Sequence, residues 1–305
     1  MKEGKPSITA ELTAAVRAAE SLRPKHKRVC YDPLAKKFLG LPFSILAKNR
    51  LLVKIVLWEV ERIAPGIASE VIARTRYIDD RLNSCIKDGI RQLVILGAGY
   101  DTRAYRFDEL KGNVKVYELD FPATQKVKIQ RVKKILRALP QNVIYVPIDF
   151  EKDPLDMKLL EHGYNKNLKT LFIWEGVTYY LTPQAIDNTL AFIVKNSGEG
   201  SSVIFDYAFQ SLLDGTSELK QLNLLLKAYE RVGTVITSEH FLSGFKEGTV
   251  ENFLLERGFL VIENVTGEYF DRAYFKGISQ KREVSRLGGI VHAKINPTYK
   301  TLPKN

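Results

Sequence analysis

The stretch that decides the fold is Leu93-Val94-Ile95-Leu96-Gly97-Ala98-Gly99-Tyr100-Asp101-Thr102-Arg103. Four consecutive apolar residues are typical of a buried strand, and the glycines after them let the chain turn sharply into a helix. Glycines at such a turn also let a ligand approach the main chain closely. A Gly-x-Gly sequence alone is better explained by a tight turn that needs glycine, so the strand before it and the acidic residues after it have to support a binding site.

Other short apolar runs follow the same pattern and predict further strands. Most of these runs are separated by helix-length segments, notably 125–139 and 183–195. Alternating strands and helices predict a parallel sheet covered on both faces. A final pair of strands is joined by a long loop without a helical pattern, and we expect that pair to be antiparallel. The expected fold is therefore an α/β, Rossmann-like, seven-stranded and mostly parallel sheet, whose predicted strands after the first are 114–118, 143–146, 171–174, 203–206, 259–265 and 289–295.

The sequence predicts one compact unit with two parts. Residues 1–88 form a helical N-terminal cap, and residues 89–305 form the sheet domain. The expected cap helices cover 9–20, 34–62 and 68–87, with one or two helices in the second range. The leucine-rich segment 210–248 interrupts the strand pattern and is expected to form an inserted helical lid.

Acidic residues follow the predicted strands at the edge where Gly97 lies. Glu118 and Asp120 come about twenty residues after Gly97, where a carboxylate can hold both hydroxyls of a ribose. Because the carboxyl ends of parallel strands share one edge of the sheet, these acids are expected to face the glycine turn. The combination predicts a nucleoside-type ligand.

The next two strands agree with this interpretation. Asp149 follows one of them, where its carboxylate can accept from an adenine amino group, and Phe150 can pack on the ring. Glu175 ends the following strand and is expected to face the same crevice. Each acid alone is more often a solvated loop residue, but their recurrence at one edge favours a binding site.

The glycine pattern also distinguishes between cofactors. The dinucleotide fingerprint requires a third glycine where this chain has Arg103, and Asp101 would place negative charge near a pyrophosphate. Both features count against an NAD-dependent oxidoreductase, which remains an alternative. They favour a cofactor without phosphate, such as S-adenosylmethionine.

Three motifs in order now resemble a known family. Residues 96–106, 117–126 and 174–183 read LGAGYDTRAYR, YELDFPATQK and WEGVTYYLTP. They are similar to the leucine carboxyl methyltransferase (PPM) family of S-adenosylmethionine-dependent methyltransferases, with the nearest resemblance to its bacterial and archaeal members. The resemblance extends from Asp32-Pro33-Leu34-Ala35 and Arg74-Thr75-Arg76 through at least residue 208.

The resemblance implies a role for each motif residue. Gly97 and Gly99 would line the methionine moiety, and Arg74 or Arg76 would hold its carboxylate, because a guanidinium fork matches a carboxylate. Asp120 would hold the ribose, and Asp149 and Phe150 would hold the adenine. Glu175 would lie near the amino group of the cofactor. The predicted cofactor-binding residues are Arg74, Arg76, Gly97, Ala98, Gly99, Asp101, Glu118, Asp120, Asp149, Phe150 and Glu175.

Methyl transfer from a sulfonium is an in-line displacement that depends mainly on positioning, so neither a metal nor a covalent nucleophile is expected. The family suggests a carboxylate or hydroxyl acceptor on a small molecule or a protein C-terminus. A carboxylate needs no general base. Tyr179, Tyr180 and Tyr207 are candidates to orient the acceptor, although wall or core aromatics explain them about equally well.

The chain is basic, with 46 Lys+Arg against 35 Asp+Glu and a formal net charge of +11. Cations concentrate in 126–137 and 25–37, which raises the alternative of a nucleic-acid-binding or RNA-modifying protein. Apolar residues at helical spacing in the first segment also fit a buried face with a solvated basic side. We favour the solvated side, because no recognised nucleic-acid-binding motif accompanies the charge.

Several other classes are disfavoured. Two cysteines and four scattered histidines give neither a disulfide framework nor zinc-ligand spacing. The most apolar early stretch, 44–60, is broken by Lys48, Arg50 and Lys54, and no secretory h-region follows the N-terminus. We therefore expect a cytoplasmic protein without a membrane-spanning helix.

Overall fold

The structure is a computed structural model that describes residues 6–41, 43–46, 49, 58, 61–62, 65–214, 241–277 and 282–300. Its centre is a seven-stranded sheet with the strand order β3-β2-β1-β4-β5-β7-β6. Neighbouring strands from β3 to β5 are parallel, and β7 is antiparallel to both β5 and β6. The predicted sheet and its antiparallel last pair are confirmed. The strands are β1 Gln92–Leu96, β2 Lys115–Asp120, β3 Val143–Pro147, β4 Thr170–Trp174, β5 Ser202–Ala208, β6 Phe259–Thr266 and β7 Gly288–Ile295.

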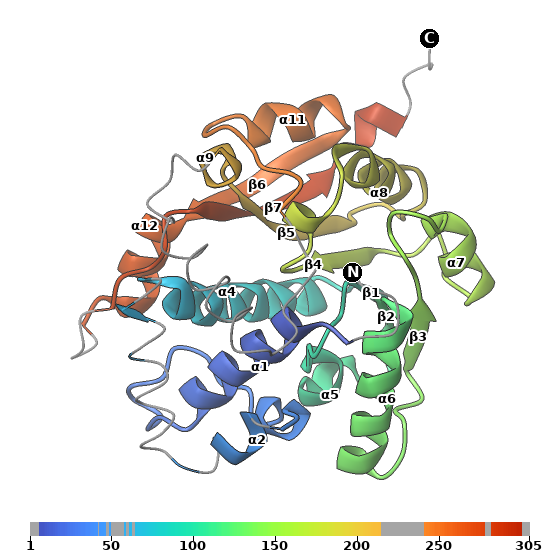
Figure 1. Ribbon diagram of the computed structural model, residues 1–305. Helices are drawn as coiled ribbons and strands as arrows, with labels where there is room; N and C mark the ends of the chain where they lie inside the picture. Colours follow the sequence, from blue (N-terminus) through green and yellow to red (C-terminus); the bar gives the residue numbers. More distant parts are fainter. Residues whose placement is uncertain are drawn as a thin grey trace.

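Helices cover both faces of the sheet (Figure 1). One apolar core lies between the sheet and α1, α4 and α6, and a second lies between the sheet and α7, α8 and α11. The longer helices are α1 Ile8–Ser21, α4 Ile67–Lys87, α6 Pro122–Leu136, α7 Leu155–Glu161, α8 Pro183–Lys195 and α11 Val250–Glu256. The shorter ones are η1 Ala35–Phe38, α2 Phe43–Leu46, α5 Arg103–Arg106, η2 Asp108–Leu110, η3 Thr178–Tyr180, α9 Gln210–Leu213, α12 Gly267–Phe270, η4 Asp271–Phe275 and η5 Pro297–Lys300.

Local sequence signals explain where the helices next to the sheet begin. Thr182 caps α8, because its side chain accepts from Ala185 N and Pro183 occupies the first turn. A proline also opens α6 at residue 122, directly after β2. This helix therefore begins three residues before the predicted start at 125, and the β2–α6 connection is correspondingly short.

Strand β1 is buried along its whole length between the two layers, as its uninterrupted apolar sequence predicts. Because β1 lies between β2 and β4, the residues that follow these three strands emerge together at one edge. The order of the strands therefore brings residues that are as much as 80 positions apart in the sequence to the same edge of the sheet.

Two expectations fall largely outside the described residues. Of the expected lid at 210–248, residues 215–240 lie outside, and α9 occupies the first part. Of the expected helices in 34–62, the described residues form η1 and α2. Among the helices that the structure describes, none is long and apolar enough to cross a membrane.

Candidate functional site

A cavity of about 320 Å³ opens at the carboxyl edge of β1, β2 and β4. Its size lies within the range of about 300–1,000 Å³ that is usual for small-molecule sites. The walls come from the ends of these strands, from α1, and from the turn that carries η3. The lining residues include Ser7, Thr9, Ala10, Thr13, Arg17, Arg74, Gly97, Ala98, Gly99, Asp101, Asp120, Phe121, Asp149, Phe150, Glu151, Glu175, Gly176, Val177, Tyr179, Tyr180 and Leu242.

The floor of the cavity is the turn after β1. Gly97 and Gly99 have φ values of 70° and 41°, in the left-handed region that favours glycine. A Cβ on Gly97 would lie 2.3 Å from Val177 Cγ2, so the turn also needs glycine for space. Glycine at this position therefore makes room for Val177, which lines the same cavity.

Asp120, at the end of β2, is tied to this turn. Its Oδ2 accepts from the main-chain nitrogen of Gly99, and its Oδ1 accepts from Phe121 N at 2.6 Å. The two bonds fix the carboxylate beside the glycines and at the cavity wall.

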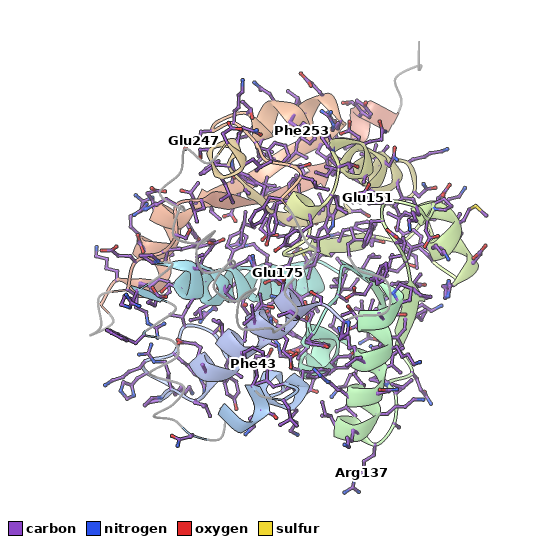
Figure 2. The ribbon with its side chains drawn as sticks, viewed as in Figure 1. Phe43, Arg137, Glu151, Glu175, Glu247 and Phe253 are labelled. Carbon is purple, nitrogen blue, oxygen red and sulfur yellow. The ribbon has the colours of Figure 1, made fainter. Side chains whose placement is uncertain are left out.

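Glu175 lies between two buried arginines. Its Oε1 accepts from Arg74 Nε at 3.0 Å, and its Oε2 accepts from Arg103 Nη1 at 2.6 Å. Burial acts to raise the pKa of Glu175, but Arg103 and Arg74 outweigh it and lower the pKa below its ordinary value. Glu175 is therefore a carboxylate at neutral pH, near the centre of the molecule in Figure 2.

Each arginine has a second acidic partner. Arg74 Nη1 donates to Asp206 Oδ2 at 2.5 Å, and Arg103 donates to Asp79 and Asp101 at 2.8 and 2.5 Å. Burial acts to raise the pKa of Asp101, yet Arg103 and Lys128 lower it to about 2. Burial raises the pKa of Asp206 above its ordinary value, although Arg74 acts against this. This end of the cavity is therefore bordered by a dense network of paired charges.

Helix α1 supplies one wall, and the sequence did not identify these residues individually. Arg17 lines the cavity, donating from Nη2 to Tyr100 O at 2.7 Å and from Nε to Asp32 Oδ2 at 3.0 Å. A signal was present, because Ala10, Thr13 and Arg17 are spaced to share one helix face. A lone cation on the apolar face of an Ala-rich helix indicates a partner inside the protein.

Asp149 and Phe150 line the opposite end of the cavity. Asp149 Oδ1 accepts from Glu151 N at 3.1 Å, which holds the carboxylate in a turn just after β3. The turn leaves Phe150 half-buried at the cavity wall.

Aromatic side chains form the wall near η3. Tyr179, Tyr180 and Phe241 pack together, with ring centroids 4.7 to 5.4 Å apart. Burial, together with Asp206, raises the pKa of Tyr179 well above its ordinary value. Its phenol therefore stays protonated and remains a hydrogen-bond donor at neutral pH.

Three of the residues predicted for the site lie away from the cavity. Arg76 is half-exposed on α4 and bonds Asp80 at 2.9 Å. Glu118 is buried beneath the glycine turn, and Tyr207 packs in the second core, where its hydroxyl donates to Asn264 at 2.9 Å. The other predicted residues all line the cavity.

Comparison with known proteins identifies relatives of this chain. Residues 10–194 match the sequence model of a family described as "Leucine carboxyl methyltransferase". A Bacillus subtilis protein named "Putative S-adenosyl-L-methionine-dependent methyltransferase YktD" is 30% identical over 222 residues, which cover 73% of this chain and 71% of that protein. A Mycobacterium avium protein named "Putative S-adenosyl-L-methionine-dependent methyltransferase" is 30% identical over 267 residues, 86% of each chain.

Solved structures show the same fold at low sequence identity. A crystal structure described as a putative methyltransferase from Thermobifida fusca has a TM-score of 0.58 at 14% identity and covers 97% of both chains. A duf574 family protein from Streptomyces avermitilis has a TM-score of 0.53 at 12% identity, covering 93% of this chain and 97% of that one.

The collision at Gly97 gives a first prediction. Gly97→Ala and Gly89→Ala both place a side chain at a positive φ, but a Cβ on Gly89 has nothing within 4 Å. We expect Gly89→Ala to cost about 1 kcal/mol of unfolding free energy, and Gly97→Ala about 1–3 kcal/mol more, because it overpacks Val177. Urea unfolding measures both. Equal losses would contradict the tight turn.

The lowered pKa of Asp101 gives a second prediction. A carboxyl whose pKa is lowered from 3.8 to about 2 stabilises the fold above pH 4, and this contribution is lost as the pH falls towards 2. Asp101→Asn should therefore cost about 2 kcal/mol at pH 7, and the difference from the unmodified protein should shrink below pH 4. Urea unfolding across this range measures it, with the exposed Asp108→Asn as control. A difference independent of pH would refute the assignment.

Proposed function

Because the chain belongs to the leucine carboxyl methyltransferase family, we propose that the cavity at the strand ends binds S-adenosyl-L-methionine and that the methyl group passes to a carboxylate or hydroxyl oxygen of an acceptor. The chain is accordingly an S-adenosyl-L-methionine-dependent methyltransferase. The observation that carries the proposed site is the position of Asp120. Its carboxylate stands at the cavity wall, bonded to the main chain of the glycine turn.

The residues present fit this cofactor. Gly97 and Gly99 line the cavity without side chains of their own, and Asp120 would hold the ribose hydroxyls. Asp149 and Phe150 would hold the adenine from the far end. Acidic side chains in the cavity also suit a ligand that carries an ammonium and a sulfonium.

The cofactor carboxylate is assigned to Arg74 rather than Arg76. Arg74 lines the cavity, whereas Arg76 is half-exposed and paired with Asp80. Glu175 and Asp206 take Nε and Nη1 of Arg74 and fix its plane. The remaining Nη2 lies 3.7 Å from where a Cβ on Gly176 would stand, an ordinary van der Waals distance.

When bound, the cofactor supplies a methyl group activated by its sulfonium. The protein then has to hold the acceptor in line and exclude water. Tyr179 and Tyr180 line the cavity on the side of Leu242, and the neutral phenol of Tyr179 is suited to donate to an acceptor oxygen. Tyr207 lies too deep to take this part directly.

The two alternatives have less support. An NAD-dependent oxidoreductase would place a pyrophosphate near Asp101, an ionised carboxylate in the wall of this cavity. For a nucleic-acid-binding protein the basic segments would be the site, but in α6 the residues Lys128 and Val132 are buried and Lys126, Lys133 and Lys134 are exposed. The exposed lysines form the solvated side of an amphipathic helix, and Lys128 is paired inside the protein with Glu118.

The two arginines of Arg74-Thr75-Arg76 give a matched test. Arg74→Lys keeps a positive charge beside Glu175 and Asp206 but loses the fork, so we expect the affinity for S-adenosylhomocysteine to fall at least about tenfold. Arg76→Gln should change it by less than about twofold. Calorimetric titration measures both, and circular dichroism checks the fold. Equal effects of the two substitutions would refute the assignment.

The acceptor atom has a chemical test. The protein is incubated with methyl-labelled S-adenosylmethionine and with carboxylic acids or peptides that have a free C-terminal carboxylate. A methyl ester releases volatile methanol in mild alkali, whereas a methyl ether does not. We expect alkali-labile label on a carboxylate or alkali-stable label on a hydroxyl oxygen, and none with Asp120→Asn. Label found by mass spectrometry on nitrogen or carbon would overturn oxygen transfer.

A further inference from the structure

A buried ion pair lies directly beneath the glycine turn. Lys128 of α6 and Glu118 of β2 face each other, with 2.9 Å between Nζ and Oε2, and each side chain is 1% exposed. Neither lines the cavity. Burying both charges costs free energy, and apolar replacements of such pairs are often no less stable. The pair therefore needs an explanation other than stability.

Lys128 makes a second contact that reaches the site. Its Nζ donates to the carbonyl oxygen of Ala98 at 3.2 Å. Ala98 is the middle residue of the Gly-x-Gly turn, and its own main-chain nitrogen donates to Leu119 O at 2.8 Å. The main-chain nitrogen of Ala98 is thus held by β2, and Lys128 is one of the donors that hold its carbonyl oxygen.

The orientation of one peptide group transmits this contact to the cavity. In a trans peptide the C=O and the next N–H point in opposite directions. When the Ala98 carbonyl points down at Lys128, the Gly99 N–H points up, where Asp120 accepts it. The Ala98 carbonyl also accepts from Asp101 N at 2.8 Å within the turn. Because both glycines have positive φ values, the turn has freedom that ordinary residues lack, and Lys128 supplies a second donor that holds the same carbonyl.

Glu118 in turn holds the lysine. Its Oε2 also accepts from Tyr105 OH at 2.8 Å, and Tyr105 OH lies 3.1 Å from Tyr145 OH. Gln125 donates to the main-chain oxygen of Glu118 at 3.0 Å. Glu118 Oε2 is therefore the atom that meets both Lys128 and Tyr105, whereas the buried Oε1 makes no hydrogen bond to the described residues. The Oε2 contacts hold the ammonium beneath the turn.

We propose that Lys128 and Glu118 are positioning residues for the cofactor: Lys128 sets the Ala98–Gly99 peptide that aims the Gly99 amide at Asp120, and Glu118 holds the ammonium in place. The inference rests on the proposed function, because it concerns affinity for the same cofactor. It also gives Glu118 a role different from the ribose contact expected from the sequence.

The test compares cofactor binding with stability in the full chain. Lys128→Met combined with Glu118→Leu removes both charges and the side-chain donor to Ala98. If the pair only stabilised the fold, this apolar replacement would leave cofactor affinity unchanged. We expect a urea midpoint close to that of the unmodified protein and an affinity for S-adenosylhomocysteine at least tenfold lower by calorimetry. Lys128→Met with Glu118→Gln, which keeps the acceptor for Tyr105, should show the same loss and serves if the leucine variant does not fold.

Lys126→Met is the control, because it removes a lysine from the same helix at an exposed position and should leave the affinity unchanged. Wild-type affinity in a folded double variant would overturn this inference and leave the proposed function standing. If the unmodified protein failed to bind S-adenosylhomocysteine, the proposed cofactor site and this inference would both be refuted.

Discussion

The arrangement around the site depends on Glu175 lying between Arg74 and Arg103. This carboxylate follows β4, while its partners come from α4 and α5, so two ion pairs connect a strand end to two helices. Asp206 on β5 and Asp79 on α4 extend the set by binding the same arginines. Each arginine keeps a second acidic partner, so the set is a connected network of buried charges and not two isolated pairs.

This charge set also determines what the cavity can bind. It keeps Glu175 and Asp101 ionised in a buried place and presents Arg74 in a fixed plane. At the other end, Asp149 and Phe150 provide an acid and a ring, and the bare glycine turn lies between. A ligand with a carboxylate and an ammonium at one end and an aromatic base at the other matches this order. The family relationship supports the same ligand independently.

Much of this was predictable from short-range patterns. The apolar run before Gly97 required a buried strand, and the acids after the following strands had to meet at its edge once the sheet was parallel. The choice of Arg74 over Arg76 could also have been predicted from the sequence. Arg74 stands three residues after Val71 and four before Ile78, on the buried face of α4, whereas Arg76 points the other way.

Other features depend on contacts that no local pattern encodes. Glu118 and Asp120 share one face of β2, but only the tertiary structure shows that the first lies under the turn and meets Lys128. Tyr207 belongs to β5, a strand that is buried on both faces. The sequence of this strand therefore did not indicate whether Tyr207 faces the cavity or the core. The wall from α1 depends on how a distant helix packs, which its alanine-rich sequence leaves open.

The most direct test of the central claim is a crystal structure of the protein soaked with S-adenosylhomocysteine. The account predicts density over Gly97 and Gly99, with the ribose at Asp120, the adenine beside Asp149 and Phe150, and the carboxylate at Arg74. Density at any other place on the protein, or a cavity that remains empty at saturating ligand, would contradict it.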